Sequence, residues 1–580
     1  MLQINSFLRK DISQAPAPNY WDILALIFIA AIIFAVSWLL PQMAAPFSPS
    51  ESLPISLSPD ALPAYCLRSV VRICIALFFS LLVTMVIGTA AAKSHLAERI
   101  IIPTVDILQS VPVLGFLSVG VWGFLAIFPG SLLGPECAAI FAIFTAQVWN
   151  MVLSFYQSLS TIPKSLREAS HIMQLSGWQR FWRLEVPFAI PALLWNMMLS
   201  ISASWFFMVA SEAIDVNHQM IMLPGIGSYI ATAIQASDME ALCWAIGAIF
   251  ITIVIYDQVF FRPIMQWGER FRPANDTESL STSWLARLLS RARLLQFFFQ
   301  CTREGATFLL RLTNRTLGPM TYKPSAEWQS VITGISVLVR IALVALLLWA
   351  IFFLVHFFSV AVTQADIGEV LYLGAISTVR IFIVVCLCLI VWTPIGVWIG
   401  LRPEIARRIQ PMIQILSAFP ANVLFPFFAT WILHYHLNQD IWLSPLMILG
   451  TQWYIVFNVI AGTMSIPEAQ RYAVDSLGLS RLIWWWRFML PALLPHLVTG
   501  AMTATGGAWN ASIIAEAINW GGVQLYATGL GAYIAYQTKM GHSAQMALGI
   551  VMMCVYVLVI NRVFWQPLYH YAQRRSQTEG

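Results

Sequence analysis

Two stretches of the chain, 304 positions apart, share one layout. Residues 162–191 read IPKSLREASHIMQLSGWQRFWRLEVPFAIP, and residues 466–495 read IPEAQRYAVDSLGLSRLIWWWRFMLPALLP. Each begins with Ile-Pro, continues through a polar and then an aromatic-rich segment, and ends with two prolines spaced four apart. This layout predicts a short amphipathic helix, a turn, a second helix and a proline-marked start of the next long helix.

The chain around these stretches is apolar enough for a protein with many membrane spans. Of its 580 residues, 59% are hydrophobic and 10% are charged, with a mean hydropathy of +0.74. Soluble domains carry roughly 25% charged residues. The deficit favours a polytopic membrane protein, with no nucleic-acid partner. The eight cysteines include no CxxC pair, so we expect neither a disulfide framework nor a metal site.

Lysine and arginine alternate between connections, which predicts the topology. Basic connections lie at 93–99, 164–183, 262–323, 402–408, 471–487 and 562–575, and those nearly free of Lys and Arg lie at 41–65, 129–136, 213–226, 359–370, 434–445 and 517–528. Because basic loops stay inside, we expect a bacterial inner-membrane protein with about twelve transmembrane helices and both termini in the cytoplasm. The expected spans are 22–40, 66–92, 104–128, 137–160, 187–212, 241–261, 328–358, 371–400, 412–433, 443–463, 491–516 and 545–565.

The two opening stretches belong to an internal duplication. GIGSYI at 225–230 matches GLGAYI at 529–534 with a shift of 304 residues, and VRI at 71–73 matches VRI at 379–381 with a shift of 308. Two parallel six-helix copies predict an all-α fold with a pseudo-twofold axis along the membrane normal. A pathway on that axis would be lined by corresponding segments of both halves.

The duplication divides the chain into five segments. They are an N-terminal helix with its outer loop (1–65), the first repeat (66–270), a cytoplasmic linker (271–327), the first helix of the second half with its outer loop (328–370) and the second repeat (371–575). Within the linker, WLARLLSRARLLQFFFQ (284–300) predicts a basic amphipathic helix on the inner membrane surface, in contact with lipid. Binding of a partner to this helix is the alternative.

The opening stretches resemble the EAA motif of permeases from ATP-binding-cassette (ABC) importers, approximately E-A-A-x-x-x-G-A-S followed by F-x-x-V-x-L-P. The resemblance covers roughly 66–270 and 374–575. The candidate coupling residues that it assigns are Glu168, Ala169, Ser170 and Ser176 in the first copy, and Ala473, Gly478 and Ser480 in the second. The first copy departs from the motif at Gln174, where the pattern has Gly, and the second at Tyr472, where it has Glu.

The resemblance implies which partners the chain has. In the family, this loop forms a coupling helix that sits in a groove of the ATPase subunit. The chain contains no G-x-x-x-x-G-K-[ST], so a separate subunit must use ATP and Mg, and this chain carries no cofactor and catalyses no reaction. We expect two ABC ATPase subunits or domains for each chain, and an extracytoplasmic substrate-binding protein.

A second signature narrows the resemblance. ASWFFMVASEAI (203–214) and GAWNASIIAEAI (507–518) each place a Trp, six residues and a Glu after the motif. This resembles permeases of the nitrate, sulfonate, taurine and bicarbonate type, which implies a small anion as substrate. A permease for ferric iron shares the loop and is one alternative. A secondary transporter driven by an ion gradient is another, but it would place ionisable residues near the membrane midplane.

The glutamates of this signature fall near the outer surface. Glu212 lies about 37 Å along the helix from Pro187, and Glu516 is its equivalent. Trp205 and Trp509 lie two turns below on the same faces. One interpretation is an interfacial carboxylate with a Trp of the aromatic belt. The other is a hydrogen-bonded gate or docking contact at the mouth of the pathway, since a bare carboxylate would repel an anion.

The helix before Glu516 carries a stripe of small and polar residues that is a candidate pathway lining. The stripe consists of Thr499, Thr503, Gly506 and Asn510. Their spacing of 4, 3 and 4 puts them on one helical face. Close helix packing with interhelical hydrogen bonds is the alternative. The equivalents in the first half are Trp195, Leu199, Ser202 and Phe206, so a pathway lined here has one polar wall.

Overall fold

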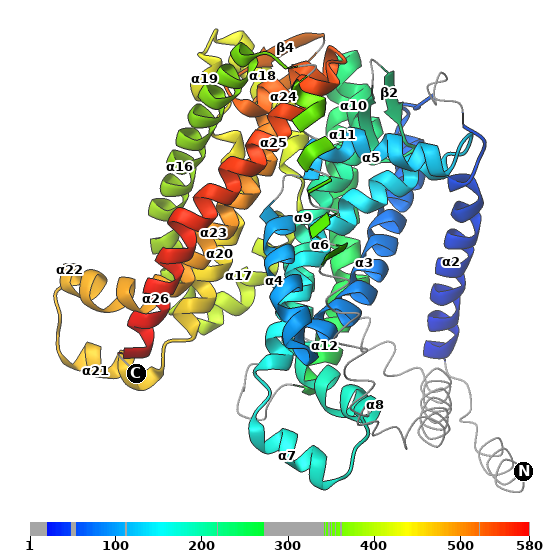
Figure 1. The fold of residues 1–580 in the computed structure, drawn as a ribbon. Coiled ribbons are helices and arrows are strands. Elements are labelled where there is room, and N and C mark those ends of the chain that lie inside the picture. The colour runs from blue at the N-terminus through cyan, green and yellow to red at the C-terminus, as the bar shows by residue number, and fades with distance from the viewer. Residues whose placement is uncertain are drawn as a thin grey trace, which may run out of the picture.

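The computed structural model describes residues 20–47, 54–110, 113–216, 219–271, 362–520 and 522–578, and most of 341–359. Nearly all of this part is helical, which confirms the all-α architecture. The helices form one bundle with two protrusions at one end, built from the opening stretches 162–191 and 466–495 (Figure 1). Two β-hairpins lie at the opposite end (Figure 1). We call these the protrusion end and the hairpin end.

The first half contains eleven described helices. They are α2 (Tyr20–Met43), α3 (Leu62–Lys93), α4 (His95–Ser110), α5 (Val113–Ile127), α6 (Leu133–Ser160), α7 (Lys164–Ile172), α8 (Gly177–Arg180), α9 (Val186–Glu212), α10 (Ile226–Ala236), α11 (Met239–Tyr256) and α12 (Arg262–Gly268). The π segments η3 (Phe181–Glu185) and η4 (Asp257–Phe261) and the 3-10 turns η2 (Pro59–Ala61) and η5 (Glu269–Phe271) adjoin them. Strands β1 (Ala213–Val216) and β2 (Gln219–Met222) pair antiparallel, Ala213 opposite Met222.

The second half repeats this order of elements, which supports the duplication inferred from sequence. Its helices are α16 (Gln364–Gly400), α17 (Pro403–Ala418), α18 (Phe425–His434), α19 (Gln439–Trp442), α20 (Leu446–Met464), α21 (Glu468–Ser476), α22 (Arg481–Trp484), α23 (Leu490–Ala515), α24 (Leu530–Lys539), α25 (Ser543–Ile560) and α26 (Gln566–Thr578). The 3-10 turn η6 (Ala421–Leu424) and the π segments η7 (Trp485–Met489) and η8 (Asn561–Trp565) adjoin them. Strands β3 (Ala517–Trp520) and β4 (Val523–Tyr526) form the second antiparallel hairpin.

Eight helical segments of the described chain are long and apolar enough to cross a membrane, and each contains or closely matches one expected span. They are Pro59–Lys93, Leu133–Ser160, Gly177–Glu212, Met239–Gly268, Gln364–Gly400, Gln439–Met464, Arg481–Ala515 and Ser543–Arg575. The expected span 22–40 lies within α2. The expected span 328–358 falls mostly outside the described residues, as do the linker from residue 272 onward and its amphipathic helix 284–300.

One expected span is wrong as a single helix. In place of 412–433, α17 and α18 meet at 71° across η6. Phe419 is extended because Pro420 follows it, and a residue before proline is disfavoured in the helical region. The expected span 104–128 covers α4 from residue 104 and α5, and residues 111–112 between these helices lie outside the described part. The apolar run 412–433 therefore contains a break that hydropathy does not register.

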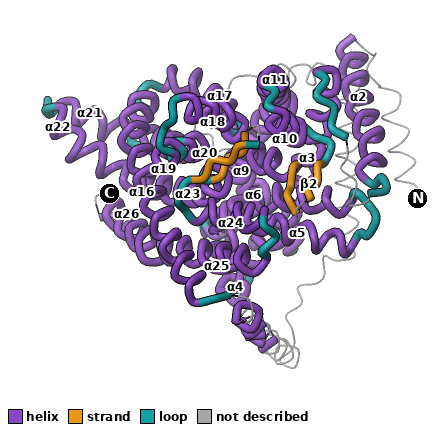
Figure 2. The backbone as a smooth tube through the Cα atoms, turned by 90° about the horizontal axis from the view of Figure 1, so that it is seen from above, coloured by secondary structure: helices purple, strands orange, loops and turns teal. Residues whose placement is uncertain are grey.

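Helices of each half pack against the other half at the interface between them. Within each half the long helices pack together, α3 with α6 and α9, and α16 with α20 and α23. Across the interface, α17 packs on α9 and α11, and α5 contacts α23. α4 contacts α25, beside which it lies in Figure 2. Ala418 and Val423 accordingly belong to the hydrophobic core of the first half. Any movement of one half relative to the other must therefore change how α4–α5 and α17–α18 pack at the interface.

Candidate functional site

Both protrusions have the local structure that their sequence predicts. α7 and α8 form the first, and α21 and α22 form the second, each with a turn between its two short helices (Figure 1). A π segment then leads into a long helix whose second residue is proline, Pro187 in α9 and Pro491 in α23. Each protrusion is thus directly continuous with a helix that runs to the hairpin end.

The turn in each protrusion needs one residue in the left-handed backbone region. Gly478 has φ +59°, and Gln174, at the equivalent position, has φ +52°. A residue with a Cβ atom pays about 1 kcal/mol for this conformation, and glycine pays almost nothing. The glycine of the EAA pattern is therefore explained by backbone geometry. Gln174 holds the same turn at a cost.

Hydrogen bonds attach each protrusion to the end of the helix before it. Arg167 donates to the carbonyl oxygen of Leu159 at 2.9 Å, and Arg471 donates to that of Thr463. These oxygens lie in the last turns of α6 and α20, where carbonyls lack partners within the helix. The equivalent arginines thus fix both protrusions to the bundle.

The other candidate coupling residues differ in exposure. Ser176 caps α8 in a capping box, and buried Ser170 donates to the carbonyl oxygen of Arg167 at 2.6 Å. Ala169 is half-buried. Glu168, Ala473, Gly478 and Ser480 are exposed. The two serines therefore have a structural role that explains their presence, whereas the exposed residues are accessible to a partner.

The protrusions also expose large apolar side chains. Met173 and Leu477 occupy equivalent positions beside the two turns, and each is 70% exposed. Ile172 and Trp486 are exposed to a similar degree. These side chains make the protrusions candidates for contact with a protein partner.

At the hairpin end, Glu212 is fully buried and fully hydrogen-bonded. Its carboxylate accepts from Ser69 Oγ at 2.5 Å, Arg72 Nη1 at 2.5 Å and the backbone N–H of Gly227 at 2.6 Å. Arg72 also donates two hydrogen bonds to Glu136, at 2.6 and 2.7 Å. Arg72 on α3 therefore joins α9 to α6, and Glu212 connects them to the start of α10.

Glu516 has the same surroundings in the second half. It accepts from Ser377 Oγ at 2.8 Å, Arg380 Nη1 at 2.6 Å and the backbone N–H of Gly531 at 2.7 Å. The second carboxylate differs, because Asp440 lies 3.7 Å from Arg380 and is 50% exposed. The first cluster is closed to solvent, and the second is partly open.

The glycines of the GIG and GLG segments make room for these carboxylates. A Cβ atom at Gly225 or Gly529 would lie 2.3–2.4 Å from the glutamate of its own half. At Gly227 and Gly531 it would lie 2.5 Å from a backbone carbonyl oxygen of α9 or α23. The carboxylate can therefore reach the N-terminus of α10 or α24, where it accepts backbone N–H groups.

These contacts do not support the interpretation of an interfacial Glu with a belt Trp. Trp205 and Trp509 are almost fully buried, packed against Tyr256 and Tyr556 respectively. Sequence reasoning missed Arg72 and Arg380, whose VRI segments served there only as evidence of duplication. The signal was available, since both arginines stand inside expected spans at equivalent positions, although Arg68 lies one turn before Arg72.

The candidate stripe on α23 is half-buried and lies partly at the interface of the halves. Thr499 and Thr503 turn their hydroxyls back to carbonyl oxygens of their own helix, at 2.8 and 2.9 Å. Gly506 faces open space, with no atom within 4 Å of a Cβ built on it. Asn510 Oδ1 accepts from the backbone N–H of Val113 at 3.0 Å. Asn510 therefore links α23 to α5 of the other half.

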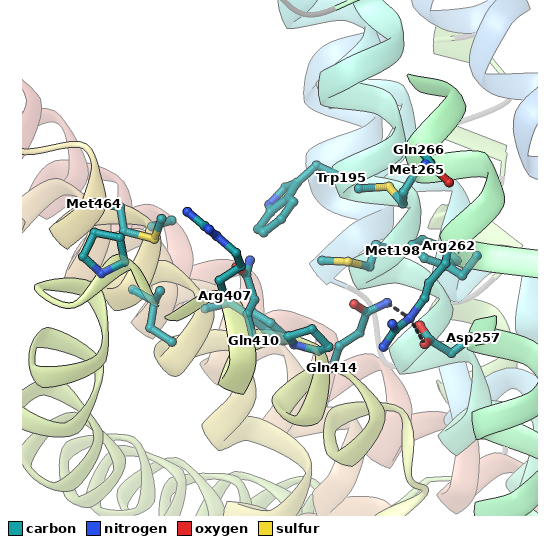
Figure 3. Close-up of a pocket in the computed structure, with 16 residues that line it drawn as sticks. Trp195, Met198, Asp257, Arg262, Met265, Gln266, Arg407, Gln410, Gln414 and Met464 are labelled. Atoms are coloured by element: carbon teal, nitrogen blue, oxygen red, sulfur yellow. Dashed lines mark hydrogen bonds and ion pairs between the residues drawn. The ribbon is translucent and has the colours of Figure 1, made fainter. Parts of the chain in front are cut away.

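A cavity of about 280 Å³ lies between the halves toward the protrusion end (Figure 3). Its walls come from α9, η4, α12, α17 and α20. Three of its charged lining residues are Asp257, Arg262 and Arg407. Two hydrogen bonds cross between the halves here or nearby, from Gln414 to Asp257 at 3.2 Å and from Ser417 to Ser202 at 3.2 Å. Sequence reasoning assigned these charged residues to basic inner connections and missed them as a cluster, apart from Asp257, which falls inside an expected span.

Comparison with known families decides the identity of this arrangement. Residues 84–260 and 392–565 each match the family described as binding-protein-dependent transport system inner membrane component. The chain belongs to this family. Two matches in one chain confirm the duplicated permease that the sequence resembles. They also make this inner membrane component a multi-pass protein of the inner membrane.

Three of the similar proteins are named as permeases for nitrate, taurine and bicarbonate. The chain is 25% identical over 186 residues to the nitrate import permease protein NrtB of Synechocystis sp.. This alignment covers 32% of the present chain and 62% of NrtB. It is 25% identical over 146 residues to the taurine transport system permease protein TauC of Escherichia coli (25% and 51%). It is 26% identical over 109 residues to the bicarbonate transport system permease protein CmpB of Synechocystis sp. (19% and 37%). The matches thus span about one third to two thirds of these relatives.

Proposed function

We propose that this inner membrane component is the transmembrane permease subunit of an ABC importer, with both permease halves in one chain. Two separate ATPase subunits or domains bind the two protrusions and use ATP and Mg. An extracytoplasmic binding protein delivers substrate at the hairpin end. The protrusions and both termini then face the cytoplasm, in agreement with the basic character of the protrusions.

The pair of protrusions carries this proposal. They lie at the same end of the bundle, and each exposes an apolar side chain at the same position, Met173 or Leu477 (Figure 1). Two equivalent docking surfaces suit a pair of similar partners. An ion-gradient-driven transporter has no use for them. Their EAA-like sequence and the family both point to ATPase subunits as those partners.

The substrate that we propose is a small anion of the nitrate, sulfonate, taurine or bicarbonate type. The named functions of the similar nitrate, taurine and bicarbonate permeases support it. The paired Trp-to-Glu segments before both hairpins are consistent with the same branch.

The long helices give a route for mechanical coupling. α9 and α23 start at the protrusions and end at Glu212 and just before Glu516. When the ATPase subunits close, the protrusions move together, and these helices transmit the movement to the hairpin end. The buried clusters around Arg72 and Arg380 fix each helix end to its own half. Each half therefore moves as a unit, and the pathway opens between the halves.

Co-purification with matched variants tests the proposal. The tagged chain is isolated from its native membrane beside a Met173→Glu/Leu477→Glu double variant and a Met540→Glu control. Met540 is an exposed methionine at the hairpin end, so its variant carries the same type of change away from the protrusions. We expect two ATPase copies per chain in the wild type and the control, and loss of both in the double variant. A chain that emerges without ATPase in all three samples contradicts the proposal.

A further inference from the structure

The cavity at the protrusion end has the composition of an anion site. Its apolar walls include Trp195, Met198, Phe457 and Ile460, and its polar groups cluster where α17 faces α12 (Figure 3). Its volume of about 280 Å³ leaves room for a small oxyanion with several waters, each of which occupies about 30 Å³. Apolar walls concentrate the field of the charges between them.

The charges in this cavity do not cancel. Asp257 binds Arg262 through Oδ2 at 2.9 Å, and its Oδ1 accepts from Gln414 at 3.2 Å. The carboxylate is thus fully used, and it neutralises Arg262. Arg407 extends from α17 toward Trp195 and makes no ion pair or hydrogen bond with any described residue (Figure 3). One guanidinium with five donors is left for a ligand.

The duplication has not copied this charge pattern to the other interface of the halves. With the shifts of 304 and 308 residues, Asp257 and Arg262 correspond to Asn561 and Gln566, and Gln414 corresponds to Asp106. Arg407 corresponds to Arg99, so the equivalent positions carry one arginine and one aspartate. At these four positions the net charge is positive in the cavity and zero in the equivalent set.

We infer that this cavity is a low-affinity anion site on the cytoplasmic side of the pathway, in which Arg407 binds a small oxyanion. The inference rests on the proposed import function and specifies the part of the pathway from which the anion leaves. The guanidinium of Arg407 donates hydrogen bonds to the oxyanion. Asp257 neutralises the charge of Arg262, so Arg262 does not act as a second free cation in the cavity. A single cation in a water-accessible cavity holds an anion weakly, which suits release into the cytoplasm.

Charged thiol reagents measure the electrostatic preference of the cavity without knowledge of the substrate. Ala461 lines the cavity and is exposed, so an Ala461→Cys variant places a thiol there. Its reaction rates with anionic methanethiosulfonate ethylsulfonate and cationic methanethiosulfonate ethyltrimethylammonium are compared in the purified full chain. The chain without this cysteine gives the background, and Met540→Cys gives the reference ratio at an open surface. A neutral methyl reagent reports whether the cavity stays accessible in each variant.

Two neighbouring arginines provide the decisive comparison. Both Arg407 and Arg408 are exposed on α17, but only Arg407 lines the cavity. We expect the ratio of anionic to cationic reaction rates to be higher for the Ala461→Cys thiol than for the Met540→Cys reference. Arg407→Gln should lower that preference roughly tenfold at low salt, Arg408→Gln should leave it nearly unchanged, and Asp257→Asn should raise it.

Equal effects of the two arginine variants, or no anion preference at all, would overturn the inference. The measurement needs no ATPase, so its failure leaves the import proposal standing. Conversely, an anion preference that depends on Arg407, in a chain that never binds an ATPase, would leave the anion site standing and remove the importer.

Discussion

Glu212 and Arg72 lie 140 residues apart in the chain and form a buried ion pair, with 2.5 Å between Oε1 and Nη1. Glu516 and Arg380 repeat this pair in the second half at 2.6 Å. Both pairs tie the far end of a helix that begins at a protrusion to the first long helix of its half. In the proposed coupling, they would give each half the rigidity that transmission from the protrusions requires.

The two arginines should differ in their contribution to stability. Arg72→Met leaves Glu212 and Glu136 buried without a cation, and removing one partner of a buried pair costs about 3–5 kcal/mol. Arg380→Met should cost less, because Asp440 is 50% exposed and remains hydrated. Thermal unfolding of both variants in detergent checks this, and equal losses would contradict the difference in burial between the clusters.

Glycine substitutions should distinguish close backbone contacts from open space. A Cβ at Gly531 would lie 2.5 Å from the carbonyl oxygen of Ser512, so Gly531→Ala should lower the unfolding temperature markedly. Gly506→Ala, on α23, meets no atom within 4 Å and should be neutral or stabilise the helix by up to about 1 kcal/mol. The same unfolding assay measures both. A destabilised Gly506→Ala variant would show that the space beside the stripe is filled.

The turns of the protrusions allow a reciprocal exchange. Gln174→Gly should stabilise the first turn by about 1 kcal/mol, and Gly478→Ala should destabilise the second by a similar amount, because both positions have positive φ. Limited proteolysis within 162–191 and 466–495 reports the stability of each turn. Gly177→Ala, where φ is not positive and no atom lies within 4 Å of the new Cβ, is the control. Faster cleavage of Gln174→Gly than of the wild type would contradict this account.

Asn510 should stabilise the interface between the halves. Asn510→Ala removes the acceptor of the Val113 N–H, a loss of about 1 kcal/mol for a neutral hydrogen bond, more if the N–H stays unpaired. We expect a modest loss of thermal stability. Thr503→Ala should change stability less, since the Thr503 hydroxyl bonds only to its own helix. A Thr503 effect larger than that of Asn510 would instead favour the packing interpretation for the threonine over the lining one.

Local sequence patterns predicted the elements well. Apolar length located eight spans, and the Ile-Pro to Pro-x-x-x-Pro layout located both protrusions, because each signal is contained within a few dozen residues. The bend at Pro420 was missed because an average over hydropathy passes through a break between two apolar helices. The available signal was the proline itself, because proline disfavours the helical conformation in the residue that precedes it.

The contacts that make up the sites could not be predicted in the same way. Glu212 meets a partner 140 residues away, and Gln414 meets Asp257 across the interface of the halves. Spacing along one helix places a residue on a face but does not say which helix it meets. Arg407 was therefore counted as one of several loop cations, although its neighbour Arg408 does not line the cavity.

The most direct test of the account is uptake by proteoliposomes that contain the chain, its ATPase subunits and its binding protein. Labelled nitrate, bicarbonate and taurine are supplied separately. ATP is present or absent on the side of the membrane that carries the ATPase subunits. Ionophores remove ion gradients in a parallel set of samples. We predict ATP-dependent uptake of at least one of the three, unchanged by ionophores and abolished by Met173→Glu/Leu477→Glu. Uptake that follows an ion gradient, needs no ATP and survives that double change would contradict the central claim.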